Sequence, residues 1–293
     1  MSRFGFCFFL FALCFCSIQS INYRPAVLMH GIIAKASDMD ELAGWLKTAF
    51  PDIYVVSIEI GNGVEDSLIW PLDKQVEHFC QKVHNDSRLQ QGFNMLGFSQ
   101  GSLITRGALE RCSLPVYNYI TLSGNHQGVF GIPYLLKIPA HYRELITKYA
   151  YEESVQNEVG IANYWRDPTQ LDKYYEHCHF LPDINNERAV RNETYRNNML
   201  KLNAFVMTYS DIDEVITPRE SGLFRGYYNE SLAIETWNSS RQFTEDLIGL
   251  RTLFEQGKLH TFTSHTRHQD TPHKPNKDFF MENILSFFNN TLS

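Results

Sequence analysis

The sequence predicts an α/β fold with a mostly parallel, doubly wound sheet. Short apolar segments alternate with amphipathic helical segments in the first half of the chain, and the alternation resumes towards its C-terminal end. That order is typical of a parallel sheet with helices on both faces. The chain has 293 residues, of which 43% are hydrophobic, and this suits one large domain that carries an insertion. We therefore expect a single domain over residues 21–293.

A serine flanked by glycines stands at the centre of this pattern. The segment Gly97-Phe98-Ser99-Gln100-Gly101 spells G-x-S-x-G. An apolar strand ends at Leu96 just before it, and apolar residues at helical spacing follow it. Strand, sharp turn and helix in this order form the nucleophile elbow of α/β-hydrolases, in which small residues let the strand and the helix pass closely. The motif predicts that fold, with Ser99 at the apex of the turn.

The overall charge argues against a nucleic-acid partner. The net charge is −7, and the chain has no basic run of the density that nucleic-acid binding requires. We interpret the negative charge as one that keeps the protein soluble, with no specific partner implied.

The N-terminus reads as a secretory signal peptide over residues 1–20. Arg3 supplies a positive start, Phe4–Cys16 is an apolar run, and Ser17–Ser20 offers small residues for cleavage. Thirteen apolar residues are too few to cross about 30 Å of hydrocarbon as a helix. We therefore expect no transmembrane anchor and a mature protein in the secretory pathway.

Cysteines and glycosylation sequons agree with that route. Cleavage leaves Cys80, Cys112 and Cys178, and an odd number implies one disulfide and one free thiol. Cys178 stands between two histidines, but one thiol and two imidazoles are too few ligands for a metal site. We expect neither a metal nor another cofactor. The N-x-S/T sequons that predict glycosylated surface loops are at Asn85, Asn192, Asn229, Asn238 and Asn289.

The first half of the chain supplies most of the predicted sheet. Ala26–Met29 reads as a buried strand that ends in a glycine turn at His30-Gly31-Ile32. Asp38 and Glu41 have the spacing of a capping box, and the helix they begin ends before Pro51. The further elements expected in this half are a strand over 53–60, a helix over 73–83, the elbow strand, a helix up to Cys112, and a strand over 116–122.

The alternation breaks between about residues 124 and 196. We interpret this stretch as a mostly helical insertion over the carboxyl edge of the sheet, with helices over 142–162 and 195–202. Val129–Ile138 within it is apolar but interrupted by glycine and proline. The pattern resumes with strands over 204–208 and 259–264 and an amphipathic closing helix over 276–288.

The residues for acyl chemistry follow the serine in the required order. A serine hydroxyl is nucleophilic only when a base removes its proton, and a third group must orient that base. In this fold the acid and then the histidine follow the serine, each after the carboxyl end of a strand. The residues in those places are Asp211, Asp213 and Glu214 for the acid, and His265, His268 and His273 for the base. We assign Asp213 and His268, and keep Asp211 and His265 as the alternatives.

Two backbone N–H groups are needed to stabilise the tetrahedral intermediate. One is expected from Gln100, directly after the serine. The other is expected from Ile32 in the loop after the first strand, where Gly31 lets the backbone come close to the oxyanion.

Over roughly residues 25–288 the chain resembles the palmitoyl-protein thioesterases, which are lysosomal α/β-hydrolases that remove fatty acyl groups from cysteine. Long and compositionally unusual strings carry the resemblance. They are Leu89-Gln90-Gln91-Gly92-Phe93 before the elbow, His126-Gln127-Gly128-Val129-Phe130-Gly131, Tyr164-Trp165 with Asp167-Pro168, and Asp183-Ile184-Asn185 with Glu187-Arg188.

The resemblance implies roles for individual residues. The nucleophile falls on Ser99, the acid on Asp213, the oxyanion donors on Ile32 and Gln100, and the disulfide on Cys80 and Cys112. The family has a glycine close before its histidine, and the segment Ser264–Gln269 lacks one. An ungapped match from Gly257 falls on His268, whereas a short gap would choose His265.

The function that follows is the hydrolysis of palmitoyl groups from S-acylated cysteines of proteins or peptides, through an acyl-enzyme, in the lysosome or after secretion. Under this hypothesis Val129–Ile138 lines a channel for the acyl chain. Two alternatives use the same fold. One is a secreted lipid esterase or acyltransferase with the same three residues. The other is an inactive binding protein, which the presence of all three residues disfavours.

Overall fold

Six parallel strands form the sheet of the computed structural model, which describes residues 22–131, 139–228 and 232–292. The strand order is β2-β1-β3-β4-β5-β6, and every neighbouring pair is parallel. The expected parallel sheet is therefore confirmed. The bounds of the strands are Ala26–Met29 for β1, Val55–Ile58 for β2, Phe93–Phe98 for β3, Val116–Leu122 for β4, Ala204–Ser210 for β5 and Leu259–Ser264 for β6.

Alternate side chains of the central strands enter two separate cores, one on each face of the sheet. In β1, Val27 and Met29 belong to one apolar cluster, whereas Ala26 and Leu28 belong to the other. All four are fully buried. Both faces of these strands must therefore be covered, which explains why they read in the sequence as continuous apolar runs and not as alternating ones.

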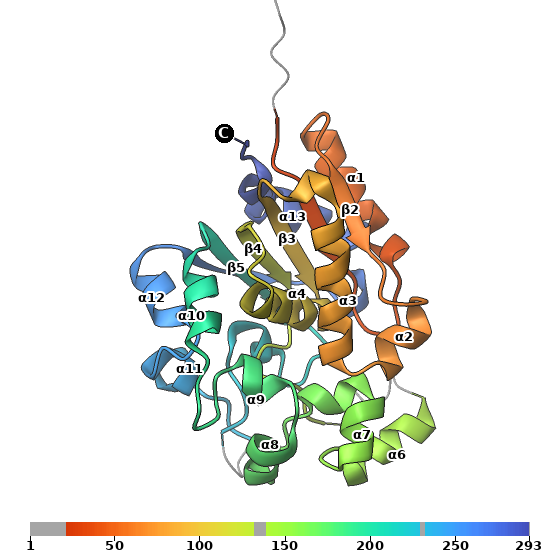
Figure 1. Cartoon of the computed structure of the whole chain (residues 1–293), viewed down its shortest axis with the longest axis vertical. Coiled ribbons are helices and arrows are strands. Elements are labelled where there is room, and N and C mark those ends of the chain that lie inside the picture. The colour runs from red at the N-terminus through yellow and green to blue at the C-terminus, as the bar shows by residue number, and fades with distance from the viewer. Residues whose placement is uncertain (1–21, 132–138, 229–231, 293) are drawn as a thin grey trace, which may run out of the picture.

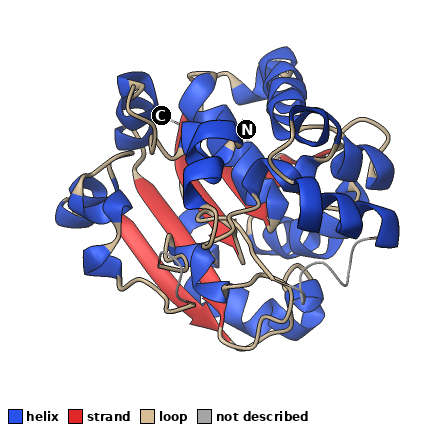
Figure 2. Cartoon of the chain, turned by 90° about the horizontal axis from the view of Figure 1, so that it is seen from below, coloured by secondary structure: helices blue, strands red, loops and turns tan. Residues whose placement is uncertain are grey.

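Helices cover both faces, as Figures 1 and 2 show. Apolar side chains of α3 (Leu72–Asn85), α4 (Gln100–Arg111), α10 (Glu193–Leu200) and α12 (Leu250–Glu255) join the cluster of Val27. Those of α1 (Asp40–Ala49), α13 (Lys277–Asn283) and the 3-10 helix η8 (Leu285–Phe288) join the cluster of Leu28. The sheet is thus doubly wound. The predicted closing helix is divided among the 3-10 helix η7 (Lys274–Asn276), α13 and η8.

The predicted capping box at Asp38 is wrong. A 3-10 helix, η1 (Ala36–Met39), precedes α1, and Asp38 lies inside it. The Asp38 carboxylate accepts a hydrogen bond from the backbone N–H of Lys35 at 2.9 Å, so it closes the turn before the helix instead of starting the helix. Glu41, the other half of the predicted box, accepts from the backbone N–H of Lys274 at 2.7 Å.

The helix predicted over 142–162 is broken into α6 (Ala140–Tyr149), α7 (Glu153–Glu158) and the 3-10 helix η3 (Gly160–Tyr164). One buried side chain bonds to the backbone of both neighbours of α7. The Gln156 amide donates hydrogen bonds to the carbonyl oxygens of Ala150 at 2.6 Å and Ala162 at 2.8 Å. A buried carbonyl needs a partner where a helix ends, so the first bond serves the break after α6, whereas the second joins α7 to η3.

Most helices between β4 and β5 lie at the carboxyl end of the sheet, whereas α10 contacts α4 on one face, where Asn198 Nδ2 donates to the Glu110 carbonyl oxygen at 2.8 Å. The chain leaves β4 and pairs with the segment after η3, since Val129 N–H donates to the Tyr164 carbonyl at 3.1 Å and Arg166 N–H to the Val129 carbonyl at 2.9 Å. Figure 1 shows α6, α7, α8 and α9 together at the end of the molecule opposite the C-terminus. The bounds of α8 and α9 are Leu171–His177 and Leu181–Ile184.

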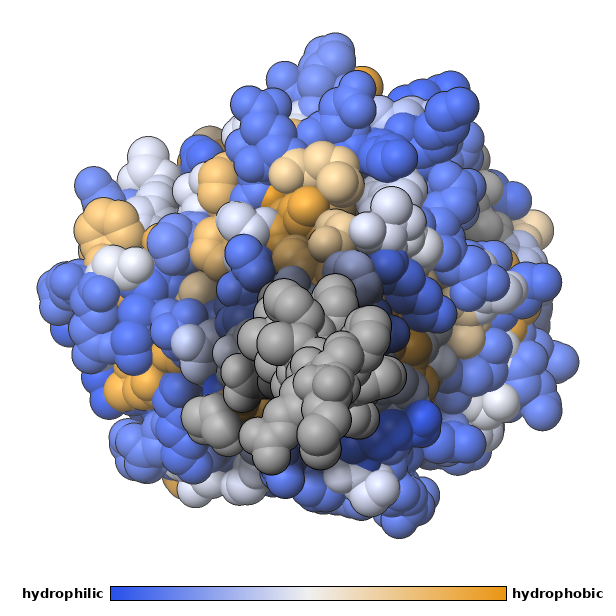
Figure 3. Space-filling model, turned by 90° about the horizontal axis from the view of Figure 1, so that it is seen from above, coloured by the Kyte–Doolittle hydropathy of each residue, from blue (hydrophilic) through white to orange (hydrophobic). Residues whose placement is uncertain are grey.

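The remaining elements are short. They are α2 (Val64–Ile69), α11 (Arg241–Thr244) and the 3-10 helices η2 (Ser87–Leu89), η4 (Arg219–Leu223), η5 (Trp237–Ser239) and η6 (His268–Asp270). Within the described ranges, no helix combines the length and the apolar character that crossing a bilayer requires. Seen from above, the surface is mostly hydrophilic, with apolar residues gathered in small areas (Figure 3). The predicted signal peptide over 1–20 lies outside the described residues.

Candidate active site

Ser99 occupies the sharp turn between β3 and α4. Its backbone has φ 53° and ψ −127°, which is a rare conformation for a residue with a side chain. The two glycines of the motif are sterically required. A Cβ on Gly97 would lie 2.6 Å from the Gly101 carbonyl oxygen, and one on Gly101 would lie 2.4 Å from the His30 carbonyl oxygen. The sequence motif therefore folds into the turn that it predicts.

His268 reaches Ser99 from the loop after β6. Its Nε2 lies 3.0 Å from Ser99 Oγ, and its Nδ1 lies 2.7 Å from Asp213 Oδ2. A carboxylate only accepts hydrogen bonds, so the Nδ1 atom carries the proton and Nε2 is the acceptor that faces the serine hydroxyl. The Phe98 ring packs against the imidazole with the ring centres 5.0 Å apart. The three side chains thus form one hydrogen-bonded series.

The two oxygens of Asp213 have different partners. Oδ2 faces His268, whereas Oδ1 accepts from the backbone N–H groups of Val215 at 2.8 Å and Ile216 at 2.9 Å. The carboxylate is therefore held by its own turn after β5 and cannot rotate away from the imidazole. Its side chain is 2% exposed. Asp213 therefore has two roles, since it forms its own turn and also pairs with His268.

The alternative acid and base pair with each other at the surface. His265 Nδ1 lies 2.8 Å from Asp211 Oδ1, and the two side chains are 76% and 49% exposed. Glu214 accepts from the backbone N–H of His268 at 3.2 Å, and His273 lies 3.2 Å from a Glu41 oxygen. The structure therefore brings Asp213 and His268 together with Ser99 and leaves Asp211 and His265 outside that series.

The loop after β1 touches the serine. A Cβ on Gly31 would lie 3.2 Å from the Ser99 Cβ, which is a tight contact, so glycine eases the close approach of this loop to the serine. The His30 side chain stabilises this loop, because its Nδ1 donates to the Gly31 carbonyl oxygen at 2.8 Å. Burial lowers the pKa of His30, so the neutral ring is favoured. The assignment of the Ile32 and Gln100 N–H groups as oxyanion donors stays a prediction; Gln100 directly follows Ser99, and Ile32 lines a pocket together with Ser99.

A pocket of about 290 Å³ opens beside Ser99 and His268. Its apolar lining comes from the loops after β1, β5 and β6, with Ile33, Met39, Val215 and Pro272 among the residues. No motif in the sequence indicates these residues. Their place in the chain could have indicated them, because these loops follow strands whose carboxyl ends lie at the same edge of the sheet as Ser99. The acyl channel predicted over Val129–Ile138 stays a prediction, since residues 132–138 lie outside the described residues.

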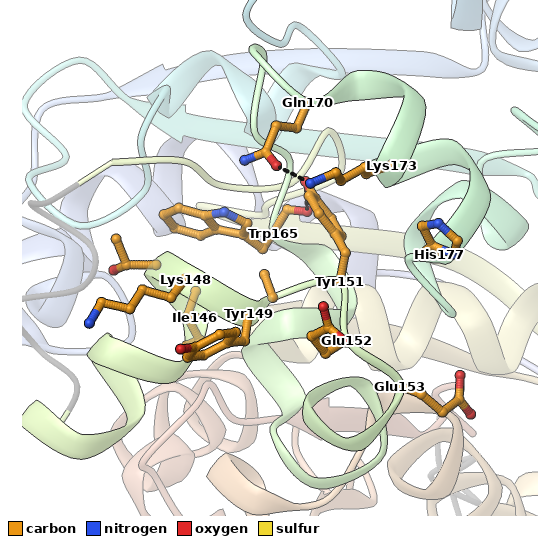
Figure 4. A pocket seen from close by; sticks show the side chains of 12 residues that line it. Ile146, Lys148, Tyr149, Tyr151, Glu152, Glu153, Trp165, Gln170, Lys173 and His177 are labelled. Carbon is orange, nitrogen blue, oxygen red and sulfur yellow. Dashed lines mark hydrogen bonds between the residues drawn. The ribbon is translucent and has the colours of Figure 1, made fainter.

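A second pocket of about 350 Å³ lies among α6, α7 and α8 (Figure 4). Tyr149, Tyr151 and Trp165 line it, and Gln170 accepts a hydrogen bond from Lys173 at 3.0 Å within it. Ser99, Asp213 and His268 are not among its lining residues. We therefore place no acyl chemistry there. Within the part of the chain that the structure describes, no cluster of His, Cys, Asp or Glu could hold a metal ion.

Cys80 and Cys112 form a disulfide, which confirms the pairing implied by the resemblance. The bond joins α3 to the residue after α4, at the end of that helix far from Ser99. Cys178 is a buried free thiol whose pKa burial raises to about 12. Of the sequons, Asn85, Asn192, Asn238 and Asn289 are exposed, whereas Asn229 lies outside the described residues. Glycosylation of these residues stays a prediction.

The chain matches the family model described as palmitoyl protein thioesterase over residues 25–268. It is 45% identical over 251 residues to palmitoyl-protein thioesterase 3 of Dictyostelium discoideum, covering 85% of this chain and 86% of the relative. It is 33% identical to palmitoyl-protein thioesterase 1 of Caenorhabditis elegans, covering 86% and 91%. The lysosomal thioesterase PPT2 homolog of Drosophila melanogaster is 35% identical, covering 85% and 88%.

Solved structures agree in fold. The bromoperoxidase of Bacillus anthracis superposes with a TM-score of 0.51 at 12% identity, over 92% of each chain. A lipase-esterase related protein of Clostridium acetobutylicum gives 0.50 at 12% identity, over 90% of this chain and 95% of that one. At such low identity these matches support the fold alone. With a family match from residue 25 to residue 268, the chain belongs to the palmitoyl protein thioesterase family and has the α/β-hydrolase fold.

Proposed function

We propose that this protein hydrolyses thioesters between long-chain fatty acids, palmitate among them, and the cysteines of acylated proteins or peptides, with Ser99 as the nucleophile. The observation that carries the proposal is the series Asp213–His268–Ser99, with contacts of 2.7 and 3.0 Å. Membership of the family supports the thioester as the bond that is cleaved.

The first half of the reaction transfers the acyl group to Ser99. The Ser99 oxygen attacks the carbonyl carbon while His268 Nε2 accepts the hydroxyl proton. The backbone N–H groups of Ile32 and Gln100 donate to the oxyanion that forms. When the carbon–sulfur bond breaks, the cysteine sulfur leaves and His268 returns the proton to it. A thiol has a pKa near 8.5, so its departure needs less help from an acid than that of an alcohol.

The second half releases the fatty acid. A water molecule gives one proton to His268 while its oxygen attacks the acyl carbon. The ester bond to Ser99 then breaks, and the proton passes to the serine oxygen, which restores the free enzyme. Throughout both halves Asp213 keeps the proton of the neutral imidazole on Nδ1 and stabilises the imidazolium that forms.

The apolar pocket beside Ser99 suits the part of the acyl chain nearest the carbonyl. Ile32, Met39 and Phe98 are among the apolar residues that line it. Each methylene buried from water contributes about 0.8 kcal/mol, so an apolar wall here raises the affinity for fatty acyl groups. The proposed substrates are accordingly S-palmitoylated proteins and peptides and other long-chain acyl thioesters.

We place the protein in the lysosome. This proposal combines the predicted signal peptide and sequons with the names of relatives such as the Drosophila lysosomal thioesterase PPT2 homolog. Expression in animal cells tests it. Digestion with endoglycosidase is expected to lower the apparent mass, and the protein is expected to co-localise with lysosomal markers. A cytosolic, unglycosylated product would contradict the location and leave the activity untouched.

The activity is tested with a palmitoyl-cysteine peptide. Wild type is expected to release palmitate and free thiol in equal amounts, whereas Ser99→Ala and His268→Ala are each expected to reduce kcat by at least about 10³-fold. His265→Ala is the matched control, because His265 is an exposed histidine of the same loop, and its activity is expected to stay near that of wild type. Full activity in Ser99→Ala would overturn the mechanism. Activity on glycerolipid esters alone would overturn the substrate class.

A further inference from the structure

The side chain of Gln100 is buried directly behind the nucleophile, and its amide is hydrogen-bonded at both ends. Its Oε1 accepts from the Tyr164 hydroxyl at 2.8 Å. Its Nε2 donates to the Ser67 carbonyl oxygen at 2.7 Å and to Gln75 Oε1 at 3.2 Å. Gln100 and Tyr164 are both fully buried. A primary amide has two N–H donors and one acceptor oxygen, so these three partners fix the orientation of the group.

Gln75 gives the network a single direction. Its Nε2 donates to the Trp70 carbonyl oxygen at 2.7 Å and to the Ser67 carbonyl oxygen at 3.2 Å. Because those two carbonyls face the NH₂ group of Gln75, the amide oxygen of Gln75 must face Gln100. The NH₂ group of Gln100 therefore points to Gln75, and only its oxygen is left for Tyr164.

The network joins three parts of the chain at the residue next to Ser99. Ser67 belongs to α2, Gln75 to α3, and Tyr164 to η3. The backbone N–H of Leu72 also donates to Asn163 Oδ1 at 2.7 Å, which links the start of α3 to η3 a second time. The region between β4 and β5 is thus connected to Gln100 through side chains that water does not reach.

The position of Gln100 gives this network a bearing on catalysis. Gln100 is the first residue of α4, and the first N–H groups of a helix have no acceptor within the helix. The direction of the Gln100 N–H depends on the peptide plane that it shares with Ser99, and the ψ of Ser99, −127°, sets that plane. A side chain anchored at three points restricts the rotation of that plane.

We propose that Tyr164 and Gln75 are positioning residues, which hold the Gln100 N–H towards the oxyanion by means of the buried Gln100 side chain. The proposal rests on the function proposed above for Ser99. Since the oxyanion exists only in the transition state and the intermediate, a less well held N–H lowers kcat and leaves the affinity for the ground-state substrate unchanged.

The test compares Tyr164→Phe with Tyr174→Phe. Both tyrosines are fully buried and belong to the segment of the chain that connects β4 to β5. Tyr174 OH donates to Glu187 Oε2 at 2.7 Å. Each variant therefore loses one buried hydroxyl, but only the first loses a contact with Gln100. With a palmitoyl-cysteine peptide, Tyr164→Phe is expected to lower kcat about 5- to 30-fold, less than the 10²–10³-fold loss of a whole oxyanion donor. KM is expected to stay within about twofold of wild type, and Tyr174→Phe is expected to keep the kcat of wild type.

The rate of covalent labelling of Ser99 by a fluorophosphonate separates this proposal from the one on which it rests. Labelling depends on the serine, the histidine and the oxyanion donors, and needs no thioester substrate. Slower labelling in Tyr164→Phe but not in Tyr174→Phe would support the positioning role even if palmitoyl-cysteine proved to be the wrong substrate. Equal labelling rates and an unchanged kcat in Tyr164→Phe would overturn it, as would a change in KM alone or the same loss of kcat in Tyr174→Phe.

Gln100→Met keeps the proposal testable if Tyr164→Phe does not fold. Methionine fills a similar volume and makes none of the three hydrogen bonds, while the backbone N–H remains. Labelling of Gln100→Met is expected to be slower than that of wild type by at least the factor expected for Tyr164→Phe. A rate equal to that of wild type would overturn the proposal.

Discussion

His268 Nε2 lies 3.0 Å from Ser99 Oγ, although 169 positions separate the two residues in the chain. The contact is made at the carboxyl ends of β3 and β6, which are not neighbours in the sheet. The loop after β6 has to cross that edge to reach the serine. β5 lies between these two strands in the sheet, and Asp213, in the turn after it, accepts from the imidazole Nδ1.

The two acid–histidine pairs allow a matched comparison. Asp213→Asn is expected to reduce kcat by about 10³- to 10⁴-fold, because an amide at this place favours the wrong tautomer of His268. Asp211→Asn makes the same carboxylate-to-amide change in the exposed partner of His265 and is expected to stay within about twofold of wild type. Steady-state hydrolysis of a palmitoyl-cysteine peptide measures both. A large loss in Asp211→Asn together with normal activity in Asp213→Asn would reverse the assignment.

The glycines of the elbow are expected to be intolerant of a single methyl group. Gly101→Ala would place its Cβ 2.4 Å from the His30 carbonyl oxygen and 2.6 Å from that of Met29. Both are backbone atoms, which cannot move aside cheaply, so we expect at least about 2 kcal/mol of destabilisation. The control is Gly44→Ala in α1, where a Cβ meets nothing within 4 Å and alanine is expected to stabilise the helix by about 1 kcal/mol. Chemical denaturation gives both values, and equal stabilities of the two variants would contradict this account of the turn.

The sequence predicts the sheet well, because strands that are buried on both faces are continuous apolar runs in the sequence. The buried strands β1 and β4 have the expected bounds, and β3 and β5 extend only two residues further, whereas β2, expected over 53–60, covers only Val55–Ile58. The broken helix between Tyr149 and Gly160 could not be predicted in the same way. At the first break the Gln156 side chain donates to the Ala150 carbonyl oxygen, and helical spacing carries no information about such a contact.

The site was predictable in part for a similar reason. Residue order and strand ends point to Asp213 and His268 and equally to Asp211 and His265, since each pair follows the same two strands. Only burial separates them, and burial depends on how the two loops fold. The pocket residues Met39 and Val215 had no motif at all, because any apolar side chain of suitable size can line a wall.

Removal of the disulfide is expected to affect stability more than chemistry. Cys80 and Cys112 are separated by 32 positions, and closing a loop of that size stabilises the fold by about 3–4 kcal/mol in the chain-entropy model. A double variant, Cys80→Ala with Cys112→Ala, is therefore expected to unfold at a lower temperature. At 10–15 °C below its own Tm it is expected to label with a fluorophosphonate at nearly the rate of wild type. A Tm equal to that of wild type would show that the bond does not constrain the unfolded chain.

The buried ion pair of α4 predicts a stability that falls as pH rises. Arg106 and Glu110 are both fully buried, and the Glu110 carboxylate lies 3.3 Å from the guanidinium. Burial raises the pKa of Glu110 from 4.5 to about 7. In the pH range between those two values the folded state binds more protons than the unfolded state. The contribution of Glu110 to stability is therefore fully present below pH 4.5 and is lost as pH rises towards 7.

Thermal unfolding between pH 4.5 and 8 measures this effect. Wild type is expected to lose more stability across that range than Glu110→Gln, whose neutral amide does not titrate, and the difference is expected to be at least about 1 kcal/mol. The control is Glu144→Gln, since Glu144 is an exposed helical glutamate paired with Lys148. It is expected to follow the wild-type profile. Parallel profiles for wild type and Glu110→Gln would mean that Glu110 is ionised in the folded protein throughout.

The length of the acyl chain distinguishes two places in which it could lie. If the chain lies in the pocket beside Ser99, Met39→Gln places an amide in a fully buried apolar wall. The ratio of kcat/KM for palmitoyl over butyryl thioesters is then expected to fall about tenfold, because the amide loses water without gaining a partner. If the chain lies along the apolar segment 129–138, the double variant Leu135→Gln with Leu136→Gln is expected to show that fall instead. Both variants are measured with the two thioesters at saturating and limiting concentrations. Equal losses of kcat/KM on the butyryl and the palmitoyl thioester would show that the substituted residues do not hold the acyl chain. Residues that bind the distant methylenes are expected to affect only the long substrate.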